Sequence, residues 1–155
     1  MPQLVKGGKH VYGLSKVGEN GSIVIPPEAA EEYGFRDGDR VILMSGSRTS
    51  GGFGLTKPDI VGKSQLSLLA ESLPDLFAFR IPEAKPVSHK GRLFCWTKIM
   101  PGSRIVVPPD TLSGYGIGAG DLLAAGRGSF LSIAFIVRGR IMEEARKHPE
   151  LPVFE

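Results

Sequence analysis

A stretch of about forty residues occurs twice in this chain, and this internal repeat restricts the fold more than any other feature. When residues 11–48 are aligned with residues 93–130, a shift of 82 positions without a gap, 11 of the 38 aligned positions are identical. Both copies keep three pairs at the same spacing, which in the first copy are Pro26-Pro27, Tyr33-Gly34 and Gly38-Asp39. Chance rarely places such pairs in one register, so we interpret the chain as a duplication of one structural unit.

Each copy predicts the same order of elements: strand, turn, strand, short helix, strand, strand. Alternating β-branched and aromatic residues indicate the strands, and an Asn-Gly turn is expected to fold the first strand back onto the second as a hairpin. The Pro-Pro pair ends that ladder because proline has no N–H group. Pro27 suits the first position of a helix, and Gly34 suits its left-handed cap. In the first copy we expect strands at 10–17, 22–25, 40–44 and 51–56 and a helix at 27–33.

The second copy predicts strands at 93–100, 104–107, 121–126 and 129–137 and a helix at 109–115. Outside the copies we expect helices at 59–73 and 139–151, an extended segment at 75–81 and a Pro-rich linker at 81–91. The first of these helices carries Leu66, Leu69 and Leu73 on one face. The fold class is therefore mainly β with short helices (α+β). The expected domains are a first unit at 9–57, a helix with the linker at 58–90, a second unit at 91–138, and a C-terminal helix and tail at 139–155.

Composition indicates a globular protein with a mild positive charge. The 155 residues are 41% hydrophobic, and 19 Lys and Arg against 16 Asp and Glu give a net charge of +3. The excess lies in the second copy: residues 91–142 carry six bases and two acids, whereas residues 1–56 carry six of each. The apolar runs are far shorter than the ~20 residues that span a bilayer, and a single cysteine forms no internal disulfide. We therefore expect a cytoplasmic protein without a membrane segment.

Catalysis and cofactor binding have little support in the sequence. The three histidines lack metal-ligand spacing, so we expect no enzyme, no cofactor and no metal. Cys95 is interpreted as a small buried hydrophobe in a strand, and Asp39 and Asp121 as turn residues that accept backbone N–H groups. The Gly/Ser-rich stretch 44–58 lacks the Gly-Lys-Ser/Thr ending of a phosphate-binding loop. We interpret this stretch as a hairpin connection, with a small-ligand or partner contact left open.

The sequence from Ser15 to Leu43 resembles the AbrB/MazE/SpoVT-type swapped-hairpin domains of bacterial and archaeal transcription factors and antitoxins. The positions that match their pattern are Lys16, Gly21, Ile23–Pro26, Gly34, Gly38 and Asp39 in the first copy, and Lys98, Ile105–Pro108, Gly116, Gly120 and Asp121 in the second. In such proteins two chains usually exchange hairpins to close one small barrel. The resemblance therefore implies that this chain joins two ββαββ units in tandem and closes a swapped-hairpin β-barrel by itself.

The resemblance also implies a DNA-binding transcriptional regulator that grips duplex DNA with basic residues at one end of the barrel. Family members use a basic residue on the first strand, an Arg after the turn, and one or two Arg on the short helix. Here the helix positions hold Ala30 and Glu31 in the first copy and Leu112 and Ser113 in the second, so the interface carries over only in part. The expected DNA-binding residues are Lys9, Lys16, Lys90, Arg92, Lys98 and Arg104.

Two alternatives stay open at the level of the sequence. A barrel that has lost DNA binding would act as an antitoxin-like or scaffold module, with a protein or small-molecule effector bound at residues 57–90. The oligomeric state is open as well. A chain that closes its own barrel is compatible with a monomer, whereas palindromic DNA sites favour a homodimer.

Overall fold

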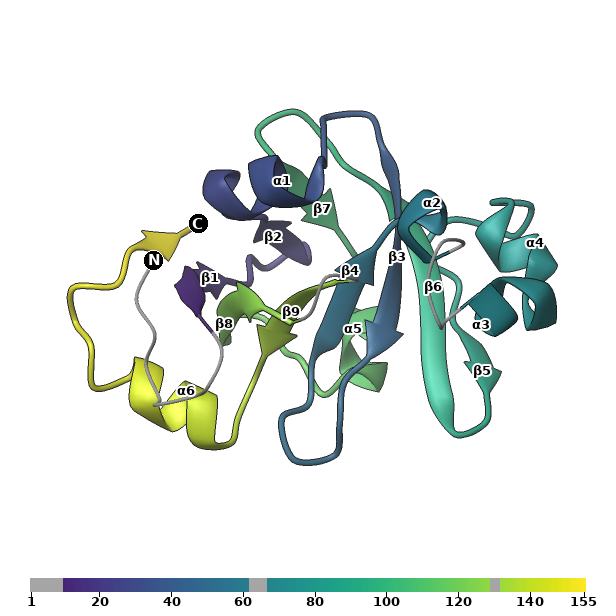
Figure 1. The fold of residues 1–155 in the computed structure, drawn as a ribbon. Coiled ribbons are helices and arrows are strands. Elements are labelled where there is room, and N and C mark those ends of the chain that lie inside the picture. Colours follow the sequence, from purple (N-terminus) through teal and green to yellow (C-terminus); the bar gives the residue numbers. More distant parts are fainter. Residues whose placement is uncertain (1–9, 62–66, 129–131) are drawn as a thin grey trace.

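An open sheet of eight strands forms the centre of the molecule, and the computed structural model describes residues 10–61, 67–128 and 132–155 (Figure 1). The strands lie in the order β10-β1-β8-β9-β4-β3-β6-β5. Their bounds are β1 Val11–Lys16, β3 Arg40–Ser45, β4 Phe53–Thr56, β5 Val87–His89, β6 Arg92–Lys98, β8 Leu122–Arg127, β9 Ile133–Ile136 and β10 Val153–Phe154. A second, antiparallel pair consists of β2 (Ser22–Val24) and β7 (Arg104–Val106). With its short helices, this is the mainly β, α+β fold that the sequence predicts.

Strands of one copy of the repeat pair with strands of the other. β1 pairs with β8, β6 pairs with β3, β4 pairs with β9, and β2 pairs with β7. The expected local hairpin between 10–17 and 22–25 was therefore wrong. β1 has β8 on one side and β10 on the other, so it has no free edge for β2. β2 has only three residues before the proline pair, which offers no N–H group to extend a ladder.

The main sheet does not close into a barrel. It ends at β10 on one side and at β5 on the other, while β2 and β7 form their own two-stranded sheet. The prediction of a closed barrel was therefore wrong. Both edge strands are short: β10, of two residues, lies parallel along β1, and β5, of three residues, lies antiparallel along β6. Short edge strands leave few unpaired backbone groups that would recruit another chain.

The short helix after each proline pair forms where the sequence predicts it. The two helices are α1 (Pro27–Tyr33) and α5 (Pro109–Gly114), and both begin at a proline. Gly34 ends α1 in the left-handed conformation at φ 69°, which glycine adopts without a steric penalty. Together with the β2–β7 pair, α1 and α5 pack against one face of the sheet and enclose the largest buried cluster of the described residues.

Helical segments outside the two copies cover the other face of the sheet. They are α2 (Pro58–Val61), α3 (Ser67–Ser72), α4 (Pro74–Phe77) and α6 (Arg140–Ala145). Leu76 and Phe77 of α4 pack with Ile42 on β3 and Phe94 on β6, whereas Met142 of α6 packs against the β1–β8 region. No helix in the described part of the chain is long and apolar enough to cross a membrane.

Three of the four expectations for these outer segments need correction, and the fourth, the helix at 59–73, falls partly outside the described residues. The helix at 59–73 is described as α2 and α3, and its residue Leu66 lies outside the described residues. The segment at 75–81 is not extended, since Pro74 and Asp75 start helix α4, as proline and an acid in a first turn favour. The linker at 81–91 contains β5, because its residues 87–89 pair with β6. The helix at 139–151 is shorter than expected and ends at Ala145.

Candidate nucleic-acid interface

Two of the expected DNA-binding residues, Lys16 and Arg104, lie in one cleft although they belong to different copies of the repeat. Lys16 is the last residue of β1, and Arg104 is the first residue of β7. The cleft has a volume of about 720 Å³, and the turn residues Glu19, Asn20 and Gly120 also line it. We call it the Lys16/Arg104 cleft. In this cleft, two cations from distant parts of the sequence line the same concave surface.

Glu155 contacts both cations of this cleft. The Nζ atom of Lys16 lies 3.7 Å from the Glu155 carboxylate, and Nη2 of Arg104 donates to the main-chain oxygen of Glu155 at 3.0 Å. The Lys16 and Glu155 side chains are 49% and 68% exposed, so water and salt screen the pair, which contributes at most about 1 kcal/mol. Sequence reasoning missed Glu155, because no local pattern indicates where a terminal segment will dock.

Arg104 is held in place by contacts around its strand. Its Nη1 group donates to Oγ of Ser22, which is its counterpart in the first copy, at 2.8 Å. In the preceding turn, the Asp37 carboxylate accepts the main-chain N–H groups of Gly102 and Ser103 at 3.3 and 3.2 Å. The carboxylate thus fixes the turn that presents the guanidinium group.

Lys98 and Arg40 form a second pair of cations on the neighbouring strands. Lys98 ends β6, and two residues later Met100 forms a β-bridge with Arg104. Arg40 on β3 lies directly opposite Lys98, and opposite residues of antiparallel strands project from the same face. The Arg40 guanidinium also lies 5.7 Å from the centre of the Trp96 ring, a cation–π contact. Arg40 was not among the expected site residues, because only the pairing of the two copies brings it to Lys98.

The other expected residues lie elsewhere. Arg92 is the first residue of β6 and Lys98 is the last, so they stand on the order of 20 Å apart along the strand. Lys90 lies in the turn that joins β5 to β6, beside Arg92. Lys9 lies outside the described residues. The structure therefore does not gather the six expected residues at one end of the molecule.

The helix positions where relatives carry arginine do not supply positive charge. These positions are Ala30 and Leu112, which are buried, and Glu31 and Ser113, which are exposed. The next residue, Glu32, accepts hydrogen bonds from the Tyr12 hydroxyl at 2.5 Å and from Nη2 of Arg127 at 2.9 Å. The bond from Tyr12, followed by that from Arg127, lowers the pKa of Glu32, and burial raises the pKa of Tyr12. Glu32 is thus engaged with β1 and β8.

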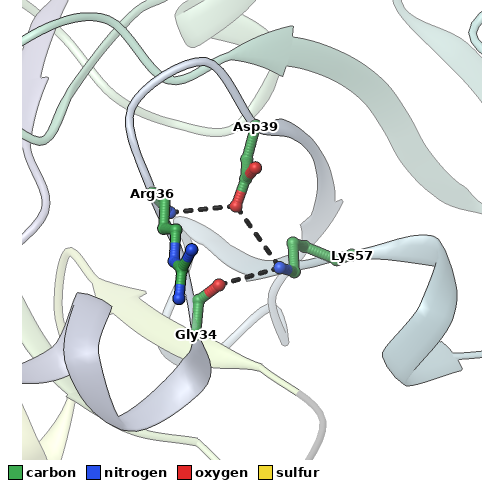
Figure 2. Close-up of polar contacts among 4 residues, drawn as sticks. All are labelled: Gly34, Arg36, Asp39 and Lys57. Atoms are coloured by element: carbon green, nitrogen blue, oxygen red, sulfur yellow. Dashed lines mark hydrogen bonds and ion pairs between the residues drawn. The ribbon is translucent and has the colours of Figure 1, made fainter.

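The Gly-Asp pair of each copy forms a turn, as predicted. The two bonds that close these turns run from the Arg36 N–H to Asp39 at 2.9 Å and from the Gly118 N–H to Asp121 at 2.8 Å. In the first copy, Lys57 Nζ lies 3.3 Å from the Asp39 carboxylate and donates to the Gly34 carbonyl at 2.8 Å (Figure 2). Lys57 therefore ties the end of α1 to the turn that begins β3.

The buried thiol is packed in the core. Cys95 is fully buried in β6, and the Tyr115 hydroxyl donates to its Sγ atom at 3.3 Å. Burial raises the pKa of this thiol to about 11, so it stays protonated near neutral pH. Its interpretation as a small buried hydrophobe is confirmed. Among the described residues, no group of three His, Cys, Asp or Glu side chains is arranged to hold a metal ion.

Comparison with known proteins relates one part of this framework to a family. The family model described as "Antidote-toxin recognition MazE, bacterial antitoxin" matches residues 14–47, which run from within β1 to the end of β3. The match supports the AbrB/MazE-like resemblance for the first copy. No curated protein matches the chain. A solved structure titled "The solution structure of PHS018 from Pyrococcus horikoshii" is similar at 13% identity and a TM-score of 0.37, over 84% of this chain and 97% of that chain.

Proposed function

We propose that this protein is a DNA-binding transcriptional regulator of the AbrB/SpoVT type, built from two tandem swapped-hairpin units in one chain. The family match over residues 14–47 supports the class. The exchange of strands between the copies, β1 with β8 and β6 with β3, supports the tandem arrangement. On this proposal the two units correspond to residues 9–57 and 91–138. Helices α2, α3, α4 and α6 of the segments 58–90 and 139–155 lie on the face of the sheet away from α1 and α5.

The observation that carries the proposal is the convergence of Lys16 and Arg104 on one cleft, with Lys98 and Arg40 opposite each other on β6 and β3, and with Met100 after β6 bridged to Arg104. Arg104 offers a planar guanidinium group for bidentate contact with a phosphate, and the lysines add point charges. Phosphate contacts supply most of the affinity of such proteins for duplex DNA and make it dependent on salt. Lys90 and Arg92 are not part of this proposed surface, because they lie at the other end of β6.

A titration of fluorescein-labelled duplex DNA from upstream of its own coding sequence, followed by anisotropy at several salt concentrations, tests the proposal. We expect binding at low salt that weakens steeply as salt rises. Arg104→Ala and Lys98→Ala are each expected to weaken binding about three- to tenfold. Each is also expected to reduce the logarithmic salt slope by about 0.9, the value for one lost phosphate contact.

Arg146→Ala provides a control with the same change in charge. Arg146 is an exposed residue directly after α6, and it does not line the Lys16/Arg104 cleft. The variant should leave both the affinity and the salt slope unchanged. An equal loss in Arg146→Ala and Arg104→Ala would reduce the interaction to unspecific charge attraction, and the absence of binding at low salt would overturn the proposal.

A protein partner is the second candidate, and the description of the matching family as an antitoxin favours it. On that alternative the chain would have lost DNA binding and would act through residues 57–90. Leu68 on α3, which is 67% exposed, offers an apolar contact there. The same titration separates the two candidates, since a protein-binding module would show no Arg104-dependent affinity for the duplex.

A further inference from the structure

A second cationic cleft lies around the Gly/Ser-rich loop between β3 and β4. The loop meets the β5–β6 turn and the end of α5 in a cleft of about 660 Å³. Three arginines line this arginine cleft: Arg48 from the loop, Arg92 at the start of β6, and Arg138 after β9. No Asp or Glu belongs to its lining among the described residues. Three guanidinium groups therefore share one volume without a carboxylate.

Arg92 is fixed in position at this cleft. Its Nη2 group donates to the carbonyl of Ser45 at 3.0 Å, and its guanidinium lies 5.6 Å from the centre of the Phe94 ring. The Ser45 hydroxyl in turn accepts the N–H group of Leu93 at 3.0 Å. A guanidinium group has five N–H donors, and the described residues accept one of them, so the others remain for a ligand. The side chain is held before any ligand arrives.

Arg138 is fixed by the loop itself. Its Nη2 group donates to the carbonyl of Arg48 at 2.8 Å, and its main-chain N–H donates to the carbonyl of Ser50 at 3.0 Å. A Cβ atom at Gly51 would lie only 2.9 Å from Nη1 of Arg138, so the absence of a side chain there gives the guanidinium its place. Gly51 thus leaves room for the Arg138 guanidinium, in addition to its role in the turn.

The charges of the arginine cleft are not compensated by the protein. None of the three arginines forms an ion pair with the residues that the structure describes. Like charges in one cleft repel each other, so a bound anion is favoured electrostatically. Hydroxyl groups of Ser47, Ser88 and Ser113 add neutral donors around the arginines. Planar guanidinium groups with hydroxyl donors match the oxygens of a phosphate group in both charge and geometry.

We propose that the arginine cleft is a binding site for a phosphate-bearing small molecule, at the end of β6 opposite to Lys98. A volume of about 660 Å³ exceeds what one phosphate ion requires and suits a ligand of nucleotide size. Arg92 belongs to this site and Lys98 to the proposed DNA surface, and the two residues lie at opposite ends of β6. The proposal stands on the arginine cleft alone and does not depend on DNA binding.

Isothermal titration of the whole protein with inorganic pyrophosphate, in chloride buffer of matched ionic strength, tests the proposal. We expect one site per chain. Arg92→Gln and Arg138→Gln should each weaken binding at least about tenfold, as loss of a bidentate charged contact does. Arg80→Gln, with the same change in charge away from the cleft, should bind like the unmodified protein. Amide NMR spectra should show shifts at Gly51, Gly52 and Gly116 on titration, a readout that needs no variant.

Two results would overturn the proposal: no pyrophosphate binding at millimolar concentration, or binding that Arg92→Gln and Arg138→Gln leave unchanged. Duplex DNA could also bring phosphate to this cleft, and the anisotropy titration separates that source. If both variants weaken duplex binding while pyrophosphate does not bind, the cleft contacts the DNA backbone and the small-ligand proposal fails. If both variants bind DNA normally and lose pyrophosphate, the small-ligand site is established whatever the outcome for Arg104→Ala.

Discussion

Glu32 shows how single side chains link the two copies of the repeat. It lies on α1 in the first copy, receives a hydrogen bond from Tyr12 on β1, and forms an ion pair with Arg127 on β8 of the second copy. Both bonds favour the charged carboxylate, which is why the pKa of Glu32 is lowered from its ordinary value of 4.5. A group with a lowered pKa in the folded state stabilises that state when it is ionised.

The Glu32 contacts lead to a pH-dependent prediction. Glu32→Gln should lower the melting temperature at pH 7 by roughly 2–4 °C, as the loss of charged hydrogen bonds does in a domain of this size. The difference in melting temperature between the two proteins should have its full size above pH 4.5. It should shrink as the pH falls further, because Glu32 of the unmodified protein then becomes protonated and loses the same contacts. Thermal melts at successive pH values from 7 downwards measure it, and a difference that shrinks at no pH below 4.5 would contradict this account.

At the scale of elements, the last strand lies where the proposed DNA surface begins. β10 runs parallel to β1, with the Leu14 N–H donating to the Pro152 carbonyl at 2.8 Å, and it brings Glu155 to Lys16 and Arg104. A Cβ atom at Gly13 would lie 2.7 Å from the Pro152 oxygen and 2.8 Å from Cε2 of Phe154. The glycine in β1 therefore makes room for this strand, and the strand places the Glu155 carboxylate beside Lys16 and the Glu155 main-chain oxygen beside Arg104.

If the proposed function holds, Glu155 and DNA phosphate compete for the same cations. Glu155→Gln is therefore expected to raise the affinity for duplex DNA about threefold or more at low salt, as removal of one anion from a phosphate-binding surface does. Gly13→Ala should have an effect in the same direction, because the added methyl group displaces Pro152 and Phe154 from β1.

Glu150→Gln is the matched control for this comparison. Glu150 pairs with His148 outside the cleft, and its replacement by Gln removes the same charge. The affinity of this variant for DNA should therefore not change. A lower affinity in Glu155→Gln would mean that Glu155 supports the DNA surface instead of competing with the phosphate.

The elements themselves were largely predictable from the sequence, whereas their pairing was not. The proline pair, the following acid and Gly34 are local signals. The helix that they predict at 27–33 has the same bounds as α1. The exchange of strands between copies is not local: the Asn-Gly turn suggested that β1 pairs with β2, but β8 offers β1 a longer partner. Lys16 and Arg104 belong to local motifs and were expected as site residues. Glu155, Arg40 and the grouping of Arg48 with Arg138 depend on contacts between distant segments and were not expected.

For the whole molecule, the strand exchange means that neither copy contains the partners of its own strands. Separation of the chain in the exposed segment between Lys85 and Pro86 would leave only β3–β4 paired in the first fragment, and β5–β6 and β8–β9 in the second. The buried cluster that the sheet shares with α1 and α5 draws on residues of both fragments. One or two isolated strand pairs without that cluster bury too little surface to be stable in water.

We therefore expect fragments 1–85 and 86–155 to lack a cooperative thermal transition when each is monomeric, and to regain one when they are mixed in equal amounts. Circular dichroism during heating measures the transition, and sedimentation shows whether the mixture is a one-to-one complex. If fragment 1–85 forms a stable pair with itself, one copy can supply the strands of the other. A fragment that melts cooperatively as a monomer would contradict the argument, because its fold would then not depend on strands from the other copy.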